Sequence, residues 1–167
     1  NKNVIKSLKG DKIMKTLIAY FSYSGNTQNL IERLNKQFNF DVVRIERKVP
    51  YSDDYDTCAY KEAKEEVEKR LHPAIKDIKG DKLDYDRFLL FFPIWWYTYP
   101  MPIATFIEKL KGFKGEIIAF ANSYTNDPQY MKNSMRDLKA IDKNLNFKEG
   151  LFNKSVKDHI EFLNNIN

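Results

Sequence analysis

Cysteine and histidine are scarce in this sequence of 167 residues. Cys58 is the only cysteine, so the chain cannot form an internal disulfide, and no Cys/His cluster has the spacing of a zinc site. The only histidines are His72, just before a proline, and His159, within a helical pattern; both are expected to be surface or partly packed residues without a catalytic role. A single thiol favours a reducing compartment. We therefore expect a cytoplasmic protein without a structural metal.

Long hydrophobic runs are also missing. The longest apolar run, Phe88 to Tyr97, is too short to span a bilayer, and Asn1 to Ile13 lacks the apolar stretch of a signal peptide. Met14 stands two residues before a strand-like segment. We expect residues 1–13 to be an extension outside the fold, residues 14–167 to form one domain, and the protein not to associate with membranes.

Positive charge is in excess but is not concentrated. Lys and Arg number 28 against 23 for Asp and Glu, a formal net charge of +5. The basic residues are scattered and often alternate with acids, as between Lys61 and Arg70, which is typical of a solvated helix face. We expect no nucleic acid as a partner.

Short apolar runs alternate with helical patterns along the whole chain. Continuous or alternating apolar residues predict strands over 16–21, 41–46, 87–92, 116–121 and 146–152. Apolar residues at helical spacing follow each strand, and the helix after the second strand has to end before Pro73. Asp127 and Ser155 are placed to cap the last two helices. The pattern predicts an α/β three-layer sandwich, with a five-stranded parallel sheet of order 2-1-3-4-5 and helices on both faces.

In a sheet of that order, a ligand crevice lies beyond the carboxyl ends of strands 1 and 3. The loop after strand 1 places hydroxyl and amide groups around a glycine where the next helix begins: Ser22, Tyr23, Ser24, Gly25, Asn26 and Thr27. The helix presents its unpaired N–H groups here, so the loop is suited to a phosphate. It has neither the lysine of a triphosphate-binding loop nor the glycines of a dinucleotide fingerprint, which favours a single terminal phosphate.

Aromatic residues follow strand 3, and a polar loop follows strand 4. The first loop contains Pro93, Ile94, Trp95, Trp96, Tyr97 and Thr98, and the second contains Asn122, Ser123 and Tyr124. Exposed rings at this edge can hold a planar ligand, although at least one tryptophan is expected to pack into the core because adjacent residues face different ways. The three loops together predict a site for a phosphorylated planar cofactor.

Two segments of the chain, the first strand with its loop and the third strand with its loop, resemble motifs of the flavodoxin family. Residues 16–27, TLIAYFSYSGNT, are similar to its FMN-phosphate loop, and residues 85–96, YDRFLLFFPIWW, are similar to its third strand and flavin loop, in the branch whose flavin loop reads Pro-Ile-Trp-Trp. The resemblance covers nearly all of residues 14–167. It implies a flavodoxin-like fold that binds FMN, with Ser22, Ser24, Asn26 and Thr27 on the phosphate, backbone N–H groups from Tyr23 and Gly25, and residues 93–98 beside the ring.

Three functions remain open on this sequence. The resemblance implies an electron-transfer protein that shuttles electrons between redox partner proteins, as a monomer or weak dimer. The alternatives are an FMN-dependent NAD(P)H oxidoreductase acting on quinones or similar acceptors, and a partner-binding module without catalysis. One departure bears on the flavin edge: Tyr97 stands where the resembling branch usually has glycine.

Overall fold

A five-stranded parallel sheet forms the centre of the computed structural model, which describes residues 13–80 and 84–166. The strand order is β2-β1-β3-β4-β5, and all four neighbouring pairs are parallel. The predicted fold class and strand order are confirmed. The strands are β1 (Thr16–Tyr20), β2 (Asp41–Arg44), β3 (Arg87–Pro93), β4 (Glu116–Asn122) and β5 (Asn146–Phe152).

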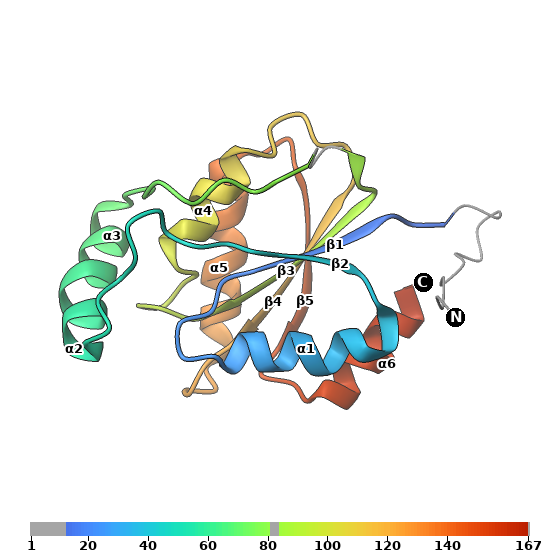
Figure 1. The fold of residues 1–167 in the computed structure, drawn as a ribbon, viewed down its shortest axis with the longest axis horizontal. Helices are drawn as coiled ribbons and strands as arrows, with labels where there is room; N and C mark the ends of the chain where they lie inside the picture. Colours follow the sequence, from blue (N-terminus) through green and yellow to red (C-terminus); the bar gives the residue numbers. More distant parts are fainter. Residues whose placement is uncertain (1–12, 81–83, 167) are drawn as a thin grey trace.

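Helices cover both faces of the sheet (Figure 1). On one face α1 lies beside α6, and on the other α4 lies beside α5. A further helical segment, in which α2, the π-helix η1 and α3 follow one another without a break, lies beyond the carboxyl ends of the strands. The helices are α1 (Asn26–Phe38), α2 (Tyr55–Thr57), η1 (Cys58–Ala63), α3 (Lys64–Lys69), α4 (Met101–Glu108), α5 (Pro128–Ile141) and α6 (Val156–Ile166).

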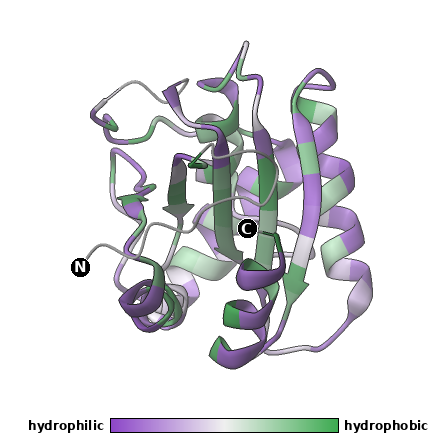
Figure 2. Ribbon diagram, turned by 90° about the vertical axis from the view of Figure 1, so that its right-hand side faces the viewer, coloured by the Kyte–Doolittle hydropathy of each residue, from purple (hydrophilic) through white to green (hydrophobic). Residues whose placement is uncertain are grey.

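The core consists of two apolar clusters, one on each face of the sheet. Phe88 and Leu90 of β3 point into the cluster under α4 and α5, whereas Leu89 and Phe91 point into the cluster under α1 and α6. All four side chains are at most 1% exposed, as expected for a central parallel strand. Figure 2 shows the inner strands as mainly hydrophobic, whereas hydrophilic and hydrophobic residues alternate along the outer helices.

The predicted helix caps are confirmed at two helices. Asp127 accepts a hydrogen bond from the N–H of Gln129 at the start of α5. Ser155 and Asp158 cap α6 reciprocally, each side chain accepting from the backbone N–H of the other. His159, expected at the surface or partly packed, is in fact buried, and its ring lies against Phe91 and Phe120.

Some boundaries differ from the sequence-based ones. The helical segment after β2 begins at Tyr55, before the apolar pattern starts, and ends at Lys69 because Arg70 adopts a left-handed conformation with φ 49°. The chain therefore leaves the helix before it reaches Pro73. Most of the predicted N-terminal extension, residues 1–12, lies outside the described residues. No helix within 13–80 and 84–166 is long and apolar enough to cross a membrane.

Candidate functional site

The loop between β1 and α1 forms a cradle of backbone N–H groups and hydroxyls. Gly25 is the N-cap residue of α1 and adopts φ 93°, a conformation that glycine reaches without a steric penalty. Because glycine has no side chain, its position supplies no cap to the first-turn N–H groups of the helix. Ser22 and Thr27 are buried on either side of this turn. The local geometry is that of an anion site at a helix N-terminus.

The loops after β1 and β4 are joined by a hydrogen bond. The Thr27 hydroxyl donates to Oδ1 of Asn122 over 3.0 Å, and the backbone N–H of Ile94 donates to the Asn122 carbonyl over 2.9 Å. On the other side, Ser123 donates its N–H to the Asn153 side chain over 2.6 Å. The start of α1 and the carboxyl ends of β3, β4 and β5 are therefore connected at the mouth of the crevice.

A crevice of about 310 Å³ opens between these loops. It lies at the carboxyl ends of β1 and β3, the switch point of this sheet order. Its walls combine hydroxyl and amide groups with aromatic rings. The lining residues are Ser22, Tyr23, Ser24, Asn26, Thr27, Tyr55, Pro93, Ile94, Trp95, Asn122, Ser123 and Tyr124.

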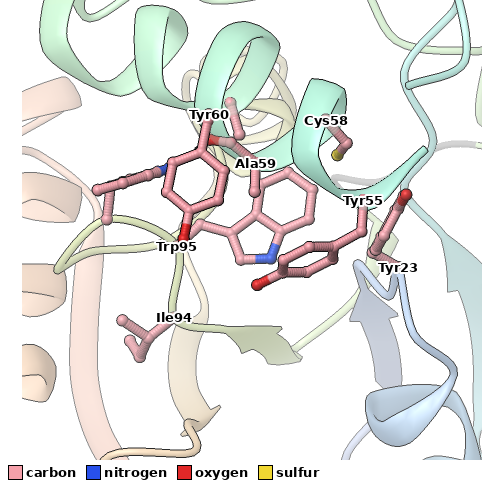
Figure 3. A pocket seen from close by; sticks show the side chains of 9 residues that line it. Tyr23, Tyr55, Cys58, Ala59, Tyr60, Ile94 and Trp95 are labelled. Atoms are coloured by element: carbon pink, nitrogen blue, oxygen red, sulfur yellow. The ribbon is translucent and has the colours of Figure 1, made fainter. Parts of the chain in front are cut away.

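A second cavity of about 230 Å³ adjoins the crevice beneath the α2–η1 segment (Figure 3). The two cavities share Tyr23, Tyr55, Ile94 and Trp95. The side chains of Tyr55, Tyr60 and Trp95 all project into this space. The remaining lining residues are Cys58, Ala59, Ala63 and Trp96.

Trp95 is one of the four residues that line both cavities. It is half-buried and makes edge contacts with Phe21, Tyr23 and Tyr51, at ring-centroid distances of 5.1, 5.7 and 5.2 Å. At least one tryptophan was expected to pack into the core. Trp95 does so in part, because its ring borders both the core and the cavities. Trp96 faces the π-helix instead, and its indole N–H donates to the Ala59 carbonyl over 2.7 Å.

The sequence model of the family described as flavodoxin matches residues 15–166. The chain belongs to the flavodoxin family. Among solved structures, it is 33% identical to a candidate flavoprotein from Bacteroides eggerthii, covering 92% of this chain and 98% of the other, with a TM-score of 0.77. It also shares the fold of a Lactobacillus acidophilus flavoprotein in complex with FMN, at 22% identity, TM-score 0.74, and coverage of 89% and 99%. A search of curated proteins finds no match.

FMN is the cofactor of the flavodoxin family, and the residues of this member fit it. The cradle at the α1 N-terminus suits the terminal phosphate, and the aromatic walls suit a planar ring. The crevice volume falls in the range of small-molecule sites, roughly 300–1,000 Å³. Ser22, Ser24, Asn26 and Thr27 would hold the phosphate, as the family resemblance implies, and Trp95 and Tyr124 would lie beside the ring.

Not all the predicted cofactor residues of this flavodoxin line the crevice. Gly25 acts through its backbone conformation, and Trp96 lines the second cavity only. Tyr97 is 60% exposed and its ring lies near Tyr130. Thr98 is buried, and its hydroxyl donates a hydrogen bond to Asp137 of α5. Neither Tyr97 nor Thr98 lines either cavity, because a tight turn at 95–98 directs both side chains towards α5. Tyr124 lines the crevice mouth but is 99% exposed.

Sequence reasoning missed the contribution of the α2–η1 segment. Tyr55 lines both cavities, while Cys58 and Tyr60 line the second. The segment follows β2, whose carboxyl end lies at the same sheet edge, and that topology was the available signal. The six-residue π-helix is a second feature often found at functional sites, but a sequence pattern does not reveal it.

Arg44 was also missed as a neighbour of the phosphate loop. The loop itself contains no cation, but β2 brings the Arg44 guanidinium within hydrogen-bonding distance of the Ser22 carbonyl, 3.1 Å, and of the Gln28 side chain, 3.1 Å. The guanidinium therefore supports the loop from behind and adds positive potential near the cradle.

A buried acid lies behind the aromatic wall. Glu66 of α3 is 5% exposed and accepts a hydrogen bond from the Tyr51 hydroxyl, while its other oxygen lies 3.9 Å from Nε of Arg47. Burial raises the pKa of the Glu66 carboxyl, and the Tyr51 hydroxyl and the Arg47 charge oppose that shift. Tyr51 also contacts Trp95, so this acid network supports the wall of the crevice.

Proposed function

We propose that this flavodoxin-family protein binds FMN non-covalently in the crevice and transfers electrons between redox partner proteins. One observation carries the proposal: a helix N-terminus with glycine at its N-cap and hydroxyls around it opens into the same crevice as a set of aromatic walls. A phosphate and a planar ring joined by a short polar chain match that arrangement. The Lactobacillus acidophilus flavoprotein of the same fold is in complex with FMN.

In this proposal, bound FMN supplies the one- and two-electron chemistry, and the protein supplies binding and orientation. The phosphate would accept hydrogen bonds from the loop 22–27, in the partial positive field of α1. Trp95 would exclude water from one side of the ring, and Tyr124 would shield its outer edge. Redox partner proteins and a cytoplasmic location accord with this role, and we propose both.

A second candidate function is an FMN-dependent NAD(P)H oxidoreductase. The cavity beneath α2 and η1 favours it, because its aromatic walls leave space beside the crevice for a second planar ligand. Hydride chemistry on a flavin requires little from the protein beyond such a space. Of the two, we favour the electron carrier because the phosphate cradle and aromatic crevice suffice for it.

A titration followed by visible spectroscopy separates these functions. The purified apoprotein is titrated with FMN and, in parallel, with riboflavin, which lacks the phosphate. Tight FMN binding with much weaker riboflavin binding supports the phosphate cradle. Stepwise reduction by dithionite with negligible oxidation of NADPH then supports the electron carrier, and rapid bleaching by NADPH alone supports the oxidoreductase. Failure to bind FMN would contradict the proposal and leave the partner-binding module.

A further inference from the structure

Two consecutive residues other than glycine adopt positive φ angles in the turn after β3. Trp96 has φ 50° and Tyr97 has φ 74°. Positive φ at both central positions is the arrangement of a type I′ turn, which Asn-Gly sequences usually form. Hydrogen bonds between Trp95 and Thr98, N–H to carbonyl in both directions over 2.8 and 3.4 Å, close the turn. Strained conformations of this kind persist only where surrounding contacts enforce them.

Asn133 of α5 supplies one such contact. Its Nδ2 donates to the Tyr97 carbonyl over 3.0 Å. The orientation of the amide is fixed, because Oδ1 accepts from Nε2 of Gln129 over 2.9 Å and faces Nη1 of Arg136 at 3.4 Å. A guanidinium can only donate and the Tyr97 carbonyl can only accept, so the amide oxygen faces Arg136 and the amide nitrogen faces the turn.

Asp137, one helical turn further along α5, holds the next residue. Its Oδ2 accepts a hydrogen bond from the Thr98 hydroxyl over 2.9 Å, and both side chains are buried. The other oxygen pairs with Nε of Arg136 at 3.1 Å and with Nη1 of Arg70 at 3.5 Å. The carboxylate is therefore satisfied in its buried position, and its interaction with Thr98 is well defined.

The turn is held from two sides. Asn133 and Asp137 are spaced i, i+4 and lie on one face of α5, while the Trp96 indole is tied to the Ala59 carbonyl of the π-helix. The residue that opens this turn is Trp95, which walls both cavities. A shift of the turn would move that wall.

We propose that Asn133 and Asp137 are positioning residues that hold the strained Trp96–Tyr97 turn from α5 and so place Trp95 at the wall of the crevice. The part of this inference that concerns the cofactor rests on the proposed FMN site. The part that concerns the turn belongs to the apoprotein and does not depend on FMN.

A double-mutant cycle between Asn133→Ala and Tyr97→Gly tests the proposal. In the apoprotein, hydrogen exchange of the Thr98 amide, measured by NMR, reports closure of the turn. We expect Asn133→Ala to speed this exchange about tenfold and to weaken FMN binding about tenfold, as for the loss of one ordinary hydrogen bond. Glycine adopts positive φ without strain, so in the Tyr97→Gly background the same change should have an effect of about twofold or less on both.

Lys139→Ala, at an exposed position of α5, is the matched control and should change neither measurement. The urea midpoint of each variant shows whether global stability has changed, an effect that a simple helix defect would produce in both backgrounds equally. The positioning role would be overturned if Asn133→Ala reduced Thr98 amide protection and FMN affinity equally in the wild-type and Tyr97→Gly backgrounds. It would also be overturned if Asn133→Ala left the Thr98 exchange rate unchanged. If the wild-type protein binds no FMN, the proposed function fails, while the exchange measurement still decides the role of Asn133.

Discussion

The Thr27 hydroxyl donates a hydrogen bond of 3.0 Å to the side-chain oxygen of Asn122. This bond connects the first turn of α1 with the end of β4, and both residues line the crevice. The proposed phosphate-binding residues lie at or just before the start of α1, and Tyr124, proposed to lie beside the ring, follows β4. The bond therefore keeps the two halves of the proposed FMN site at a fixed separation before the cofactor arrives, and such preorganisation improves affinity.

Replacing this hydroxyl should weaken FMN binding. Thr27→Val keeps the volume of the buried side chain but removes the hydroxyl, and with it both the bond to the Asn122 oxygen and any contact of this hydroxyl with the phosphate. We expect the FMN dissociation constant to rise about tenfold, equivalent to about 1.4 kcal/mol, in fluorescence titrations of the apoprotein. Thr105→Val is the matched control, because the Thr105 hydroxyl bonds to the Pro73 carbonyl away from the crevice. An equal loss of affinity in both variants would contradict the prediction.

Gly25 and Gly112 provide a matched pair for the conformation of the phosphate loop. They adopt φ 93° and 88°, and a Cβ at either position would meet no atom within 4 Å. Alanine at either site therefore introduces backbone strain without a clash, and we expect each variant to unfold in urea with a free energy lower by about 1–2 kcal/mol. Only Gly25→Ala should also weaken FMN binding, since Gly25 sets the conformation of the phosphate loop, whereas Gly112 lies in the turn after α4. Unchanged FMN affinity in Gly25→Ala would count against the cradle.

Most of the fold could be predicted because its signals are local. The run 88–92 is apolar without interruption, and such a run is buried on both faces of a parallel sheet. Asp127 and Ser155 cap helices through backbone groups two and three residues away, so their effect is also contained in a short segment. The phosphate cradle could be predicted for the same reason, since Gly25 and the hydroxyl residues around it are neighbours in the sequence.

The missed parts of the site depend on contacts between distant segments. Tyr55 and Cys58 line the cavities only because the α2–η1 segment folds over the carboxyl ends of the strands. Thr98 was expected beside the flavin, but its hydroxyl bonds to Asp137, 39 residues further along the chain. The positive φ of Trp96 opposes the ordinary preference of that residue type, and tertiary contacts decide it.

Cys58 should react slowly in the folded protein. Burial raises the pKa of its thiol to about 11, and the nearby Tyr23 hydroxyl only partly offsets this shift. An unfolded cysteine has a pKa near 8.5, so at pH 8 the thiolate fraction should be lower on the order of a hundredfold in the native state. Alkylation by iodoacetamide should therefore be slower by at least that factor without denaturant than in guanidinium. Similar rates in the two conditions would show that the thiol is neither buried nor shifted.

His159 should make stability depend on pH below neutrality. The side chain is 2% exposed, and burial lowers its pKa from the ordinary value of 6.5, while a 2.7 Å contact of Nδ1 with the Ser155 carbonyl partly opposes the shift. Below pH 6.5 the unfolded chain binds a proton that the folded protein does not. The stabilisation is therefore complete above pH 6.5 and is lost as the pH falls towards the folded pKa.

Urea unfolding at pH 7.5 and 5.5 measures this contribution. One histidine can account for a loss of up to about 1.4 kcal/mol between these values. His159→Leu places an uncharged side chain against Phe91 and Phe120 at both pH values, so the variant should lose less stability than the wild type on acidification. Subtracting the stability change of the variant between pH 7.5 and 5.5 from that of the wild type removes the contribution of the carboxylates, which both proteins share. An identical pH dependence in wild type and variant would mean that the imidazole has the same pKa in the folded and unfolded states, which would contradict the prediction.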